Sequence, residues 1–98
     1  MGAIIIAKTN VPQTMMSFEC GNPLWGATTN PYSKDHTSGG SSGGEAAVLR
    51  LSGSALGLGS DIGGSLRYVR MLGLSNYKEA ERIWCDSGFR LRIVGYIV

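Results

Sequence analysis

Residues 57–67 read Gly-Leu-Gly-Ser-Asp-Ile-Gly-Gly-Ser-Leu-Arg, a stretch in which four glycines surround one acidic and two hydroxyl side chains. The composition is not that of a flexible linker, because Asp61, Arg67 and three aliphatic residues stand among the glycines. A turn built on residues 62–65 can direct successive backbone N–H groups into one concavity, and such a nest binds an anion. If Ser65 attacks a carbonyl, the same N–H groups are placed to stabilise the oxyanion that forms.

A serine nucleophile needs a group that accepts its proton, and this requirement limits the chemistry of Ser65. The chain has one histidine, His36, which lies beside Asp35 and is interpreted as a solvated turn residue. The proton acceptor would therefore be a second hydroxyl or a lysine, as in the serine–lysine variant of the catalytic triad.

The other glycine-rich stretch, residues 39–44, reads Gly-Gly-Ser-Ser-Gly-Gly. It matches the G-x-S-x-G nucleophile elbow, but that motif needs a histidine after its serine, and none follows Ser41. Neither stretch has the Lys-Ser or Lys-Thr of a phosphate-binding loop, and Ile62 stands where a dinucleotide fingerprint requires glycine. By its own composition, this stretch is typical of a flexible linker.

The composition of the 98 residues predicts one small domain and excludes several classes of protein. Fifteen glycines and only 16% charged residues exclude a coiled coil, and no run of about 18 apolar residues predicts a transmembrane helix. A net charge of +2 is too small to indicate nucleic-acid binding, and the lone His36 beside Asp35 favours a solvated turn over a metal site. Cys20 and Cys85 allow one disulfide, but we expect two free thiols and a cytoplasmic protein, since the first residues lack the basic region of a signal peptide.

The composition changes sharply near residue 67. Residues 1–67 hold twelve of the fifteen glycines and all three prolines, and their charges cancel. Residues 68–98 hold three glycines and no proline, and five positive side chains outnumber three negative ones. We therefore expect two segments of different character or origin, 1–67 and 68–98.

The first half of the chain has clear signals of secondary structure. The Ile-rich residues 3–7 predict a short buried strand, and residues 9–37, which contain three prolines, predict mostly loop. Residues 45–51 predict a helix whose first turn contains Glu45, where the helix dipole favours an anion.

Further along the chain, residues 55–58 predict a very short strand, and residues 59–65 predict a second glycine-rich turn. A spacing similar to a capping box begins at Asn76 and predicts a short helix over residues 77–84. Apolar residues and arginines alternate over residues 89–93, which predicts a half-exposed strand.

Residues 39–45 and 57–67, at their spacing, resemble the amidase signature family. Residues 9–13, Thr-Asn-Val-Pro-Gln, and 16–26, Met-Ser-Phe-Glu-Cys-Gly-Asn-Pro-Leu-Trp-Gly, are similar to its fatty-acid-amide-hydrolase and fungal acetamidase branch. The resemblance covers about residues 3–67. It implies an α/β fold with a mixed sheet enclosed by helices, of which this chain would be a slice that is incomplete as a stand-alone domain.

The resemblance also implies roles for individual residues. Ser65 takes the place of the acylated nucleophile, and Ser41 takes that of a bridging serine, which relays a proton between nucleophile and lysine. The peptide bond between Gly40 and Ser41 is cis in the family. Ser42 and Asp61 match positions that support the loops by hydrogen bonds.

The implied oxyanion hole consists of the backbone N–H groups of Ile62, Gly63, Gly64 and Ser65, and Arg67 matches a structural arginine. The implied reaction is the hydrolysis of a small-molecule amide through an acyl-enzyme on Ser65. It needs no cofactor, no metal ion and no nucleic-acid partner.

The sequence departs from the family's pattern at two places. The family's catalytic lysine lies well upstream of the Thr-Asn-Val-Pro segment, whereas Lys8 immediately precedes Thr9; we therefore expect that lysine to be absent and the isolated chain to have little or no activity. Two residues after Arg67 the family has a proline, and this chain has Val69. Residues 68–98 match nothing that we identify in the family, and our hypothesis is that they arise from a shifted reading frame, a retained intron or an alternative exon.

Two other interpretations remain open at this point. One is a non-catalytic truncated product or interaction fragment of a larger amidase. The other is a small module that binds anions in its glycine-rich turns.

Overall fold

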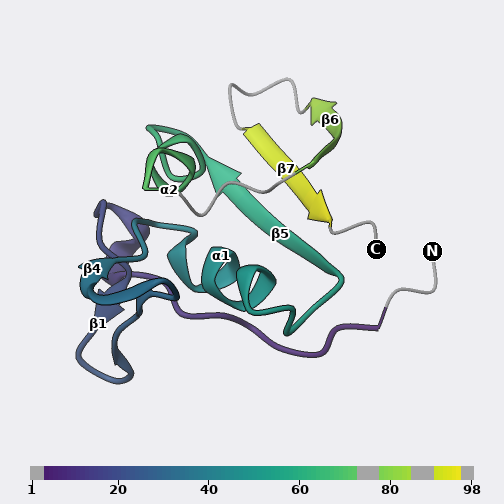
Figure 1. Cartoon of the computed structure of the whole chain (residues 1–98). Coiled ribbons are helices and arrows are strands. Elements are labelled where there is room, and N and C mark those ends of the chain that lie inside the picture. Colours follow the sequence, from purple (N-terminus) through teal and green to yellow (C-terminus); the bar gives the residue numbers. More distant parts are fainter. Residues whose placement is uncertain (1–3, 73–77, 85–89, 96–98) are drawn as a thin grey trace.

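The computed structural model describes residues 4–72, 78–84 and 90–95, and Figure 1 shows their arrangement. Short strands and helices follow one another along the chain. In chain order the described elements are η1 (Gln13–Met15), β1 (Gly21–Asn22), β2 (Gly26–Ala27), β3 (Thr29–Asn30), β4 (Ser33–Thr37), α1 (Gly43–Arg50), β5 (Leu56–Asp61), α2 (Arg67–Met71), β6 (Lys78–Trp84) and β7 (Arg90–Gly95).

Strands β5, β7 and β6 form one three-stranded sheet in that order, and both neighbouring pairs run antiparallel. β5 pairs with β7 without interruption from Leu56↔Gly95 to Asp61↔Arg90. Two small antiparallel hairpins, β1–β2 and β3–β4, precede α1 in the chain. The sheet therefore fixes the backbone of β5 up to Asp61, and the glycine-rich turn begins directly after this residue.

Helix α1 has a negative side chain near its N-terminus and a positive one near its C-terminus, as the helix dipole favours. Glu45 lies in the first turn, and Arg50 lies in the last turn. One face of the helix is buried, and Ala46 on this face belongs to the same buried apolar cluster as Val69 of α2. This contact joins the helix that follows one glycine-rich stretch to the helix that follows the other.

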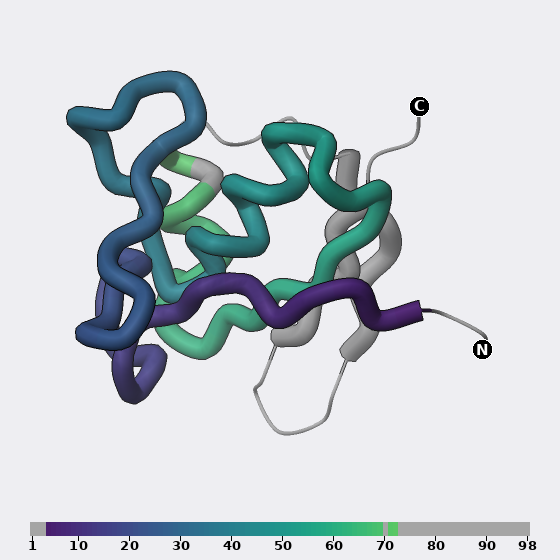
Figure 2. Tube along the Cα trace, turned by 90° about the horizontal axis from the view of Figure 1, so that it is seen from below, coloured from purple at the N-terminus to yellow at the C-terminus, as the bar shows by residue number. Residues whose placement is uncertain are grey.

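The N-terminal segment runs alongside α1 in both views (Figures 1 and 2). The Thr9 hydroxyl donates to Glu45 Oε2 at 2.8 Å, which ties this segment to the first turn of the helix. The backbone of Asn10 approaches Gly44 so closely that a Cβ built on this glycine would lie 2.5 Å from the Asn10 nitrogen. The close approach explains why α1 has a glycine at this position.

The buried apolar core of the described residues is small. Its members are Cys20, Ala46, Ala47, Leu49 and Val69. Large apolar side chains that are exposed include Ile4, Ile5, Ile6, Met15, Met16, Phe18, Leu24, Trp25, Tyr32, Leu51, Leu56, Leu58, Ile62 and Met71. Because Ile, Leu, Phe and Met are among the residue types most often buried in folded proteins, this surface is that of an incomplete domain. The predicted class, an incomplete α/β domain, is thus confirmed.

Two predictions of secondary structure are wrong. Residues 4–6 belong to no strand, and Ile5 is 92% exposed, because no strand in the described part of the chain pairs with them. The helix predicted over residues 77–84 is instead strand β6 from residue 78 onward, and residue 77 lies outside the described residues. Backbone pairing with β7 overrides the local capping signal there.

The other predicted elements are present with shifted bounds. The predicted helix over 45–51 is α1, the strand over 55–58 is β5, and the strand over 89–93 is β7, with Phe89 outside the described residues. Residues 9–37 are mostly loop, although the hairpin strands and η1 form there. Since β5 continues to Asp61, the predicted turn is shorter than residues 59–65 and begins at Ile62.

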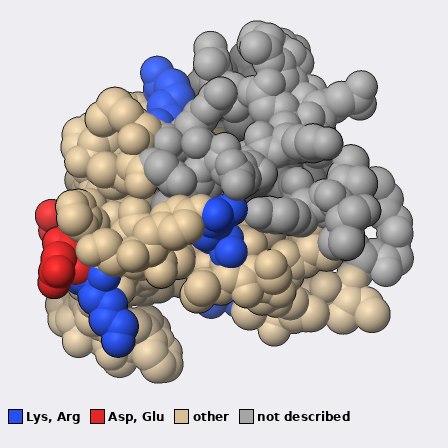
Figure 3. Space-filling view, in the orientation of Figure 1, with Lys and Arg blue, Asp and Glu red and all other residues tan. Residues whose placement is uncertain are grey.

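On the face drawn in Figure 3, the described Lys and Arg side chains are separated from one another by uncharged surface. Within the described ranges, no helix reaches the length and apolar character that a membrane span requires.

Candidate active site

The structure brings together the two serines for which the sequence predicts catalytic roles. The Ser41 hydroxyl donates to Ser65 Oγ at 2.8 Å, although the two residues lie 24 positions apart in the chain. Ser41 is buried, and Ser65 is half-buried. The peptide bond between Gly40 and Ser41 is cis, which confirms the expected conformation, and Gly39 before it has a φ of 75° that favours glycine.

Ser42 holds β5 against the loop that carries Ser41. Its hydroxyl accepts the backbone N–H of Ser60 at 3.3 Å and donates to the carbonyl of the same residue at 3.2 Å. The backbone N–H of Ser42 also donates to the Ser65 carbonyl at 3.4 Å. These bonds explain why Ser42 provides no side-chain cap for α1, because its hydroxyl is already used on the strand.

Asp61 organises the turn that leads to Ser65. Its carboxylate is 4% exposed and accepts the backbone N–H of Gly64 at 2.8 Å on Oδ1. The backbone N–H groups of Leu66 and Arg67 donate to Oδ2 at 3.2 and 3.1 Å. One carboxylate therefore fixes the backbone on both sides of Ser65.

The same carboxylate forms an ion pair with Arg67. The guanidinium Nε donates to Oδ2 at 3.1 Å, and Nη2 donates to Oδ1 at 2.9 Å. The hydrogen bond from the Arg67 side chain holds the pKa of Asp61 well below its usual range. Burial of the carboxylate opposes this shift, and the three backbone donors add to it. The carboxylate in turn raises the pKa of the Arg67 guanidinium. Both groups are charged at neutral pH.

The four N–H groups expected to form an oxyanion hole are not equivalent. That of Gly64 donates to Asp61, as described above. The described residues provide no acceptor for the N–H groups of Ile62, Gly63 and Ser65. Gly64 has a φ of 136°, a conformation that side-chain-bearing residues rarely adopt, so the turn requires glycine there.

A cavity of about 570 Å³ lies beside the two hydroxyls. Ser41, Ser60 and Ser65 line it together with the turn residues 62–63. The rest of its lining is one continuous segment, residues 14–18, for which the sequence predicts only a loop. In the sequence, the feature that connects this segment with the site is the family resemblance of residues 16–26.

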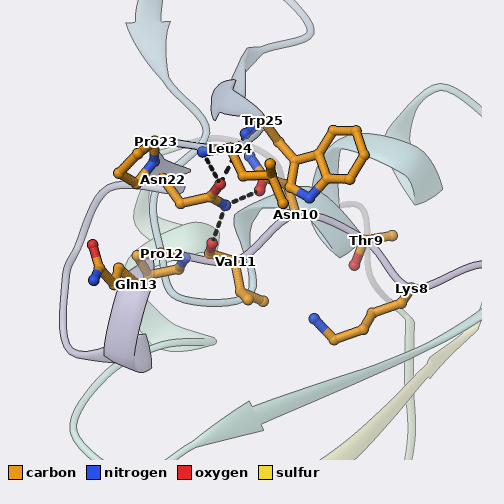
Figure 4. A pocket seen from close by; sticks show the side chains of 10 residues that line it. All are labelled: Lys8, Thr9, Asn10, Val11, Pro12, Gln13, Asn22, Pro23, Leu24 and Trp25. Carbon is orange, nitrogen blue, oxygen red and sulfur yellow. Dashed lines mark hydrogen bonds between the residues drawn. The ribbon is translucent and has the colours of Figure 1, made fainter.

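A second cavity, of about 810 Å³, lies between residues 8–13 and residues 22–25 (Figure 4). The Asn22 amide links the two segments, because its Nδ2 donates to Asn10 Oδ1 at 2.6 Å and to the Val11 carbonyl at 2.8 Å. Lys8 lines this cavity and does not line the one that contains the two serines.

The described residues provide no group of three or more His, Cys, Asp or Glu side chains that could hold a metal ion. His36 lies on β4 with its Nδ1 3.0 Å from Ser33 Oγ. The thiol of Cys20 is free and buried, and it donates to the Asn10 carbonyl at 3.0 Å. Cys85, the other predicted free thiol, lies outside the described residues.

The chain is similar to a set of amide hydrolases. The family model for amidases matches residues 1–68. The chain is 44% identical over 97 residues to "Fatty-acid amide hydrolase 1" of Sus scrofa, which covers 98% of this chain and 17% of that protein. It is 44% identical over 97 residues to "Vitamin D3 hydroxylase-associated protein" of Gallus gallus, covering 98% and 19%, and 50% identical over 66 residues to "Acetamidase" of Aspergillus oryzae, covering 67% and 12%. This chain belongs to the amidase family, and it spans less than a fifth of the length of these relatives.

The same comparisons bear on residues 68–98. The family model ends at residue 68, but two of the alignments cover 97 of the 98 residues. The expectation that this segment matches nothing in the family is therefore wrong. The hypothesis of a shifted reading frame keeps only the change of composition near residue 67 as its support. The division of the chain at residue 67 stays a prediction.

Proposed function

We propose that this chain carries the serine centre of an amidase, which hydrolyses a small-molecule amide with Ser65 as the nucleophile and Ser41 as the bridging serine. The observation that carries the proposal is the 2.8 Å hydrogen bond between the two hydroxyls, which lies beside a cavity. Family membership supports the reaction class, since relatives similar to this chain are named amidases and amide hydrolases.

In the proposed reaction, Ser65 Oγ attacks the carbonyl carbon of the amide while its proton moves to Ser41. A hydroxyl both donates and accepts, so the hydrogen bond between the serines reverses its direction as Ser41 passes its own proton to a base. The C–N bond then breaks, the amine leaves with a proton, and the acyl group stays on Ser65. Attack by water on this ester releases the acid and restores the hydroxyl.

The oxyanion of the tetrahedral intermediate would be held by backbone N–H groups. Those of Ile62, Gly63 and Ser65 are the proposed donors, because the Gly64 N–H is used by Asp61. Removing one such donor from an active site typically costs about 3–4 kcal/mol of transition-state stabilisation. The role of Asp61 and Arg67 in this proposal is to hold the turn in shape.

The proposed reaction also needs a base that accepts the proton of Ser41. Among the described side chains, neither Lys8 nor Lys34 lines the cavity with the two serines. We therefore propose that a lysine outside these 98 residues completes the unit, and that the chain alone reacts slowly. Loss of one member of such a unit typically lowers the rate by several orders of magnitude.

Labelling with a fluorophosphonate probe tests this function, with peptide mapping of the modified residue. We expect slow labelling at Ser65, acceleration by an added primary amine that replaces the lysine, and loss of that acceleration in Ser41→Ala. Ser54→Ala, which changes a serine on the exposed loop before β5, serves as the control. Rapid labelling that needs no amine would contradict the missing base, and labelling that persists in Ser65→Ala would contradict the nucleophile.

A non-catalytic interaction fragment is the second candidate, and the exposed apolar side chains of the N-terminal segment favour it. Thermal unfolding shows whether the chain folds by itself, since a cooperative transition supports a folded domain. A flat transition together with aggregation supports an unstable fragment.

A further inference from the structure

Residues 17–19 lie against the loop that carries Ser41. A Cβ built on Gly40 would lie 2.9 Å from the Ser17 carbonyl oxygen and 3.0 Å from that of Glu19. A real Cβ at residue 40 would be too close to these two oxygens. Because both belong to the backbone, they cannot rotate away as the end of a flexible side chain can. The segment and the loop are therefore in direct contact through their main chains.

The same segment reaches the loop that carries Ser65 through the ring of Phe18. A Cβ built on Gly64 would lie 3.4 Å from Phe18 Cε1, so the ring covers the residue before the proposed nucleophile. The ring also packs on Tyr68 of α2, with 4.9 Å between centroids and 44° between planes. Aromatic pairs of this geometry contribute roughly 0.5–1.5 kcal/mol beyond the area that they bury.

Tyr68, on which the Phe18 ring packs, also contacts both serine-bearing loops. Its backbone N–H donates to the Gly64 carbonyl at 2.7 Å, and its ring lies 3.3 Å from a Cβ built on Gly39. The segment keeps its own shape through a hydrogen bond from the Glu19 N–H to Ser17 Oγ at 3.1 Å. Both serine-bearing loops are thus fixed against one short segment that lies elsewhere in the sequence.

We propose that residues 17–19 are a clamp that sets the distance between Ser41 and Ser65, and that Phe18 is the positioning residue of this clamp. The inference rests on the proposed function, because it concerns the geometry of the same hydroxyl pair. Hydrogen bonds between hydroxyls have oxygen–oxygen distances of about 2.5–3.0 Å, and a misplacement of about 1 Å can lower a rate about 100-fold. A clamp that touches both loops controls this distance without contacting the substrate's reacting atoms.

The first measurement is amide hydrogen exchange in Phe18→Ala, followed by NMR, which needs no activity. We expect exchange of the Gly64 and Tyr68 amides to accelerate about tenfold or more, because their hydrogen bonds, to Asp61 and to the Gly64 carbonyl, belong to the turn that the ring contacts. The Thr28 and Ser38 amides, whose hydrogen bonds belong to the hairpin region, should stay unchanged. Leu24→Ala, which removes another exposed apolar side chain from a different cavity, should alter neither pair.

The second measurement is the rate of Ser65 labelling in the presence of a primary amine. We expect Phe18→Ala to lower this rate roughly 10- to 100-fold and Phe18→Tyr to restore it, since the ring contact with Tyr68 is kept. Phe18→Leu, which keeps apolar volume without a ring, should fall between them and replaces the alanine variant if that variant does not fold.

Two results overturn the clamp. One is unchanged exchange at Gly64 and Tyr68 in the alanine or leucine variant. The other is acceleration of all four amides together, since Phe18 would then support the whole fold and not these loops in particular. If the wild-type chain is never labelled at Ser65, the proposed function fails, while the exchange experiment still decides whether the clamp exists.

Discussion

The buried carboxylate of Asp61 and the guanidinium of Arg67 are joined by two side-chain hydrogen bonds, at 3.1 Å and 2.9 Å. Arg67 reaches this carboxylate from an exposed position, with 63% of its side chain accessible to solvent. The pair closes the ends of the turn that carries Ser65, and the carboxylate also binds N–H groups inside the turn. The charge of Asp61 is therefore part of the structure of the candidate site.

This charge makes stability depend on pH in a defined direction. Hydrogen bonding lowers the folded-state pKa of Asp61, so its contribution is fully present above the unfolded pKa of about 4 and is lost as the pH falls below that value. We expect Asp61→Asn to lower the free energy of unfolding by about 1.5–3 kcal/mol at pH 7, and the difference from wild type to shrink by pH 3. Urea unfolding of both proteins across this range checks it, and a difference that stays constant with pH would contradict it.

Ser42 and Ser54 offer a matched comparison of two hydroxyls that make the same contacts. Each accepts the backbone N–H of a β5 residue and donates to the carbonyl of that residue, Ser60 in one case and Leu56 in the other. The bonds of Ser54 are exposed, so water replaces them, whereas Ser42 is buried. We expect Ser42→Ala to cost about 1–3 kcal/mol and Ser54→Ala less than about 0.5 kcal/mol in urea unfolding. Equal losses of unfolding free energy in the two variants would show that burial does not determine how much these hydrogen bonds contribute to stability.

Gly44 and Gly63 offer a second matched comparison. A methyl group added at Gly44 meets the backbone of Asn10, while one added at Gly63 meets nothing within 4 Å. We expect Gly44→Ala to lower the free energy of unfolding by about 1–3 kcal/mol through overpacking, and Gly63→Ala to change it by no more than about 1 kcal/mol. Thermal unfolding of the two variants and of the wild type measures both changes. A Gly44→Ala protein as stable as the wild type would mean that the N-terminal segment is not held against α1.

The parts of the site that follow from the sequence are those with local signals. The composition of residues 57–67 points to Ser65, and the resemblance to the family points to Ser41; the structure brings these hydroxyls together. Glu45 lies in the first turn of α1 because a helix start is encoded by neighbouring residues. Such features depend on a few residues at fixed offsets, which a single sequence displays.

The parts that do not follow from the sequence depend on contacts between distant residues. Nothing in the residues around Phe18 indicates that its ring covers Gly64, which lies 46 positions further along the chain. The strand β6 was mistaken for a helix for the same reason, since its pairing partner β7 lies further along the chain. Residues 4–6 have the composition of a buried strand, but the described residues provide no partner for one.

The exposure of residues 4–6 leads to a prediction about association. Ile4, Ile5 and Ile6 are 86%, 92% and 68% exposed, and an exposed run of β-branched residues favours pairing between copies of a chain. We expect Ile5→Lys to reduce association, measured by light scattering over a range of concentrations, and to change the free energy of unfolding by less than about 0.5 kcal/mol. Leu51→Lys adds the same charge at another exposed apolar position and should reduce association less. If both variants reduce it equally, net charge and not this segment controls the association.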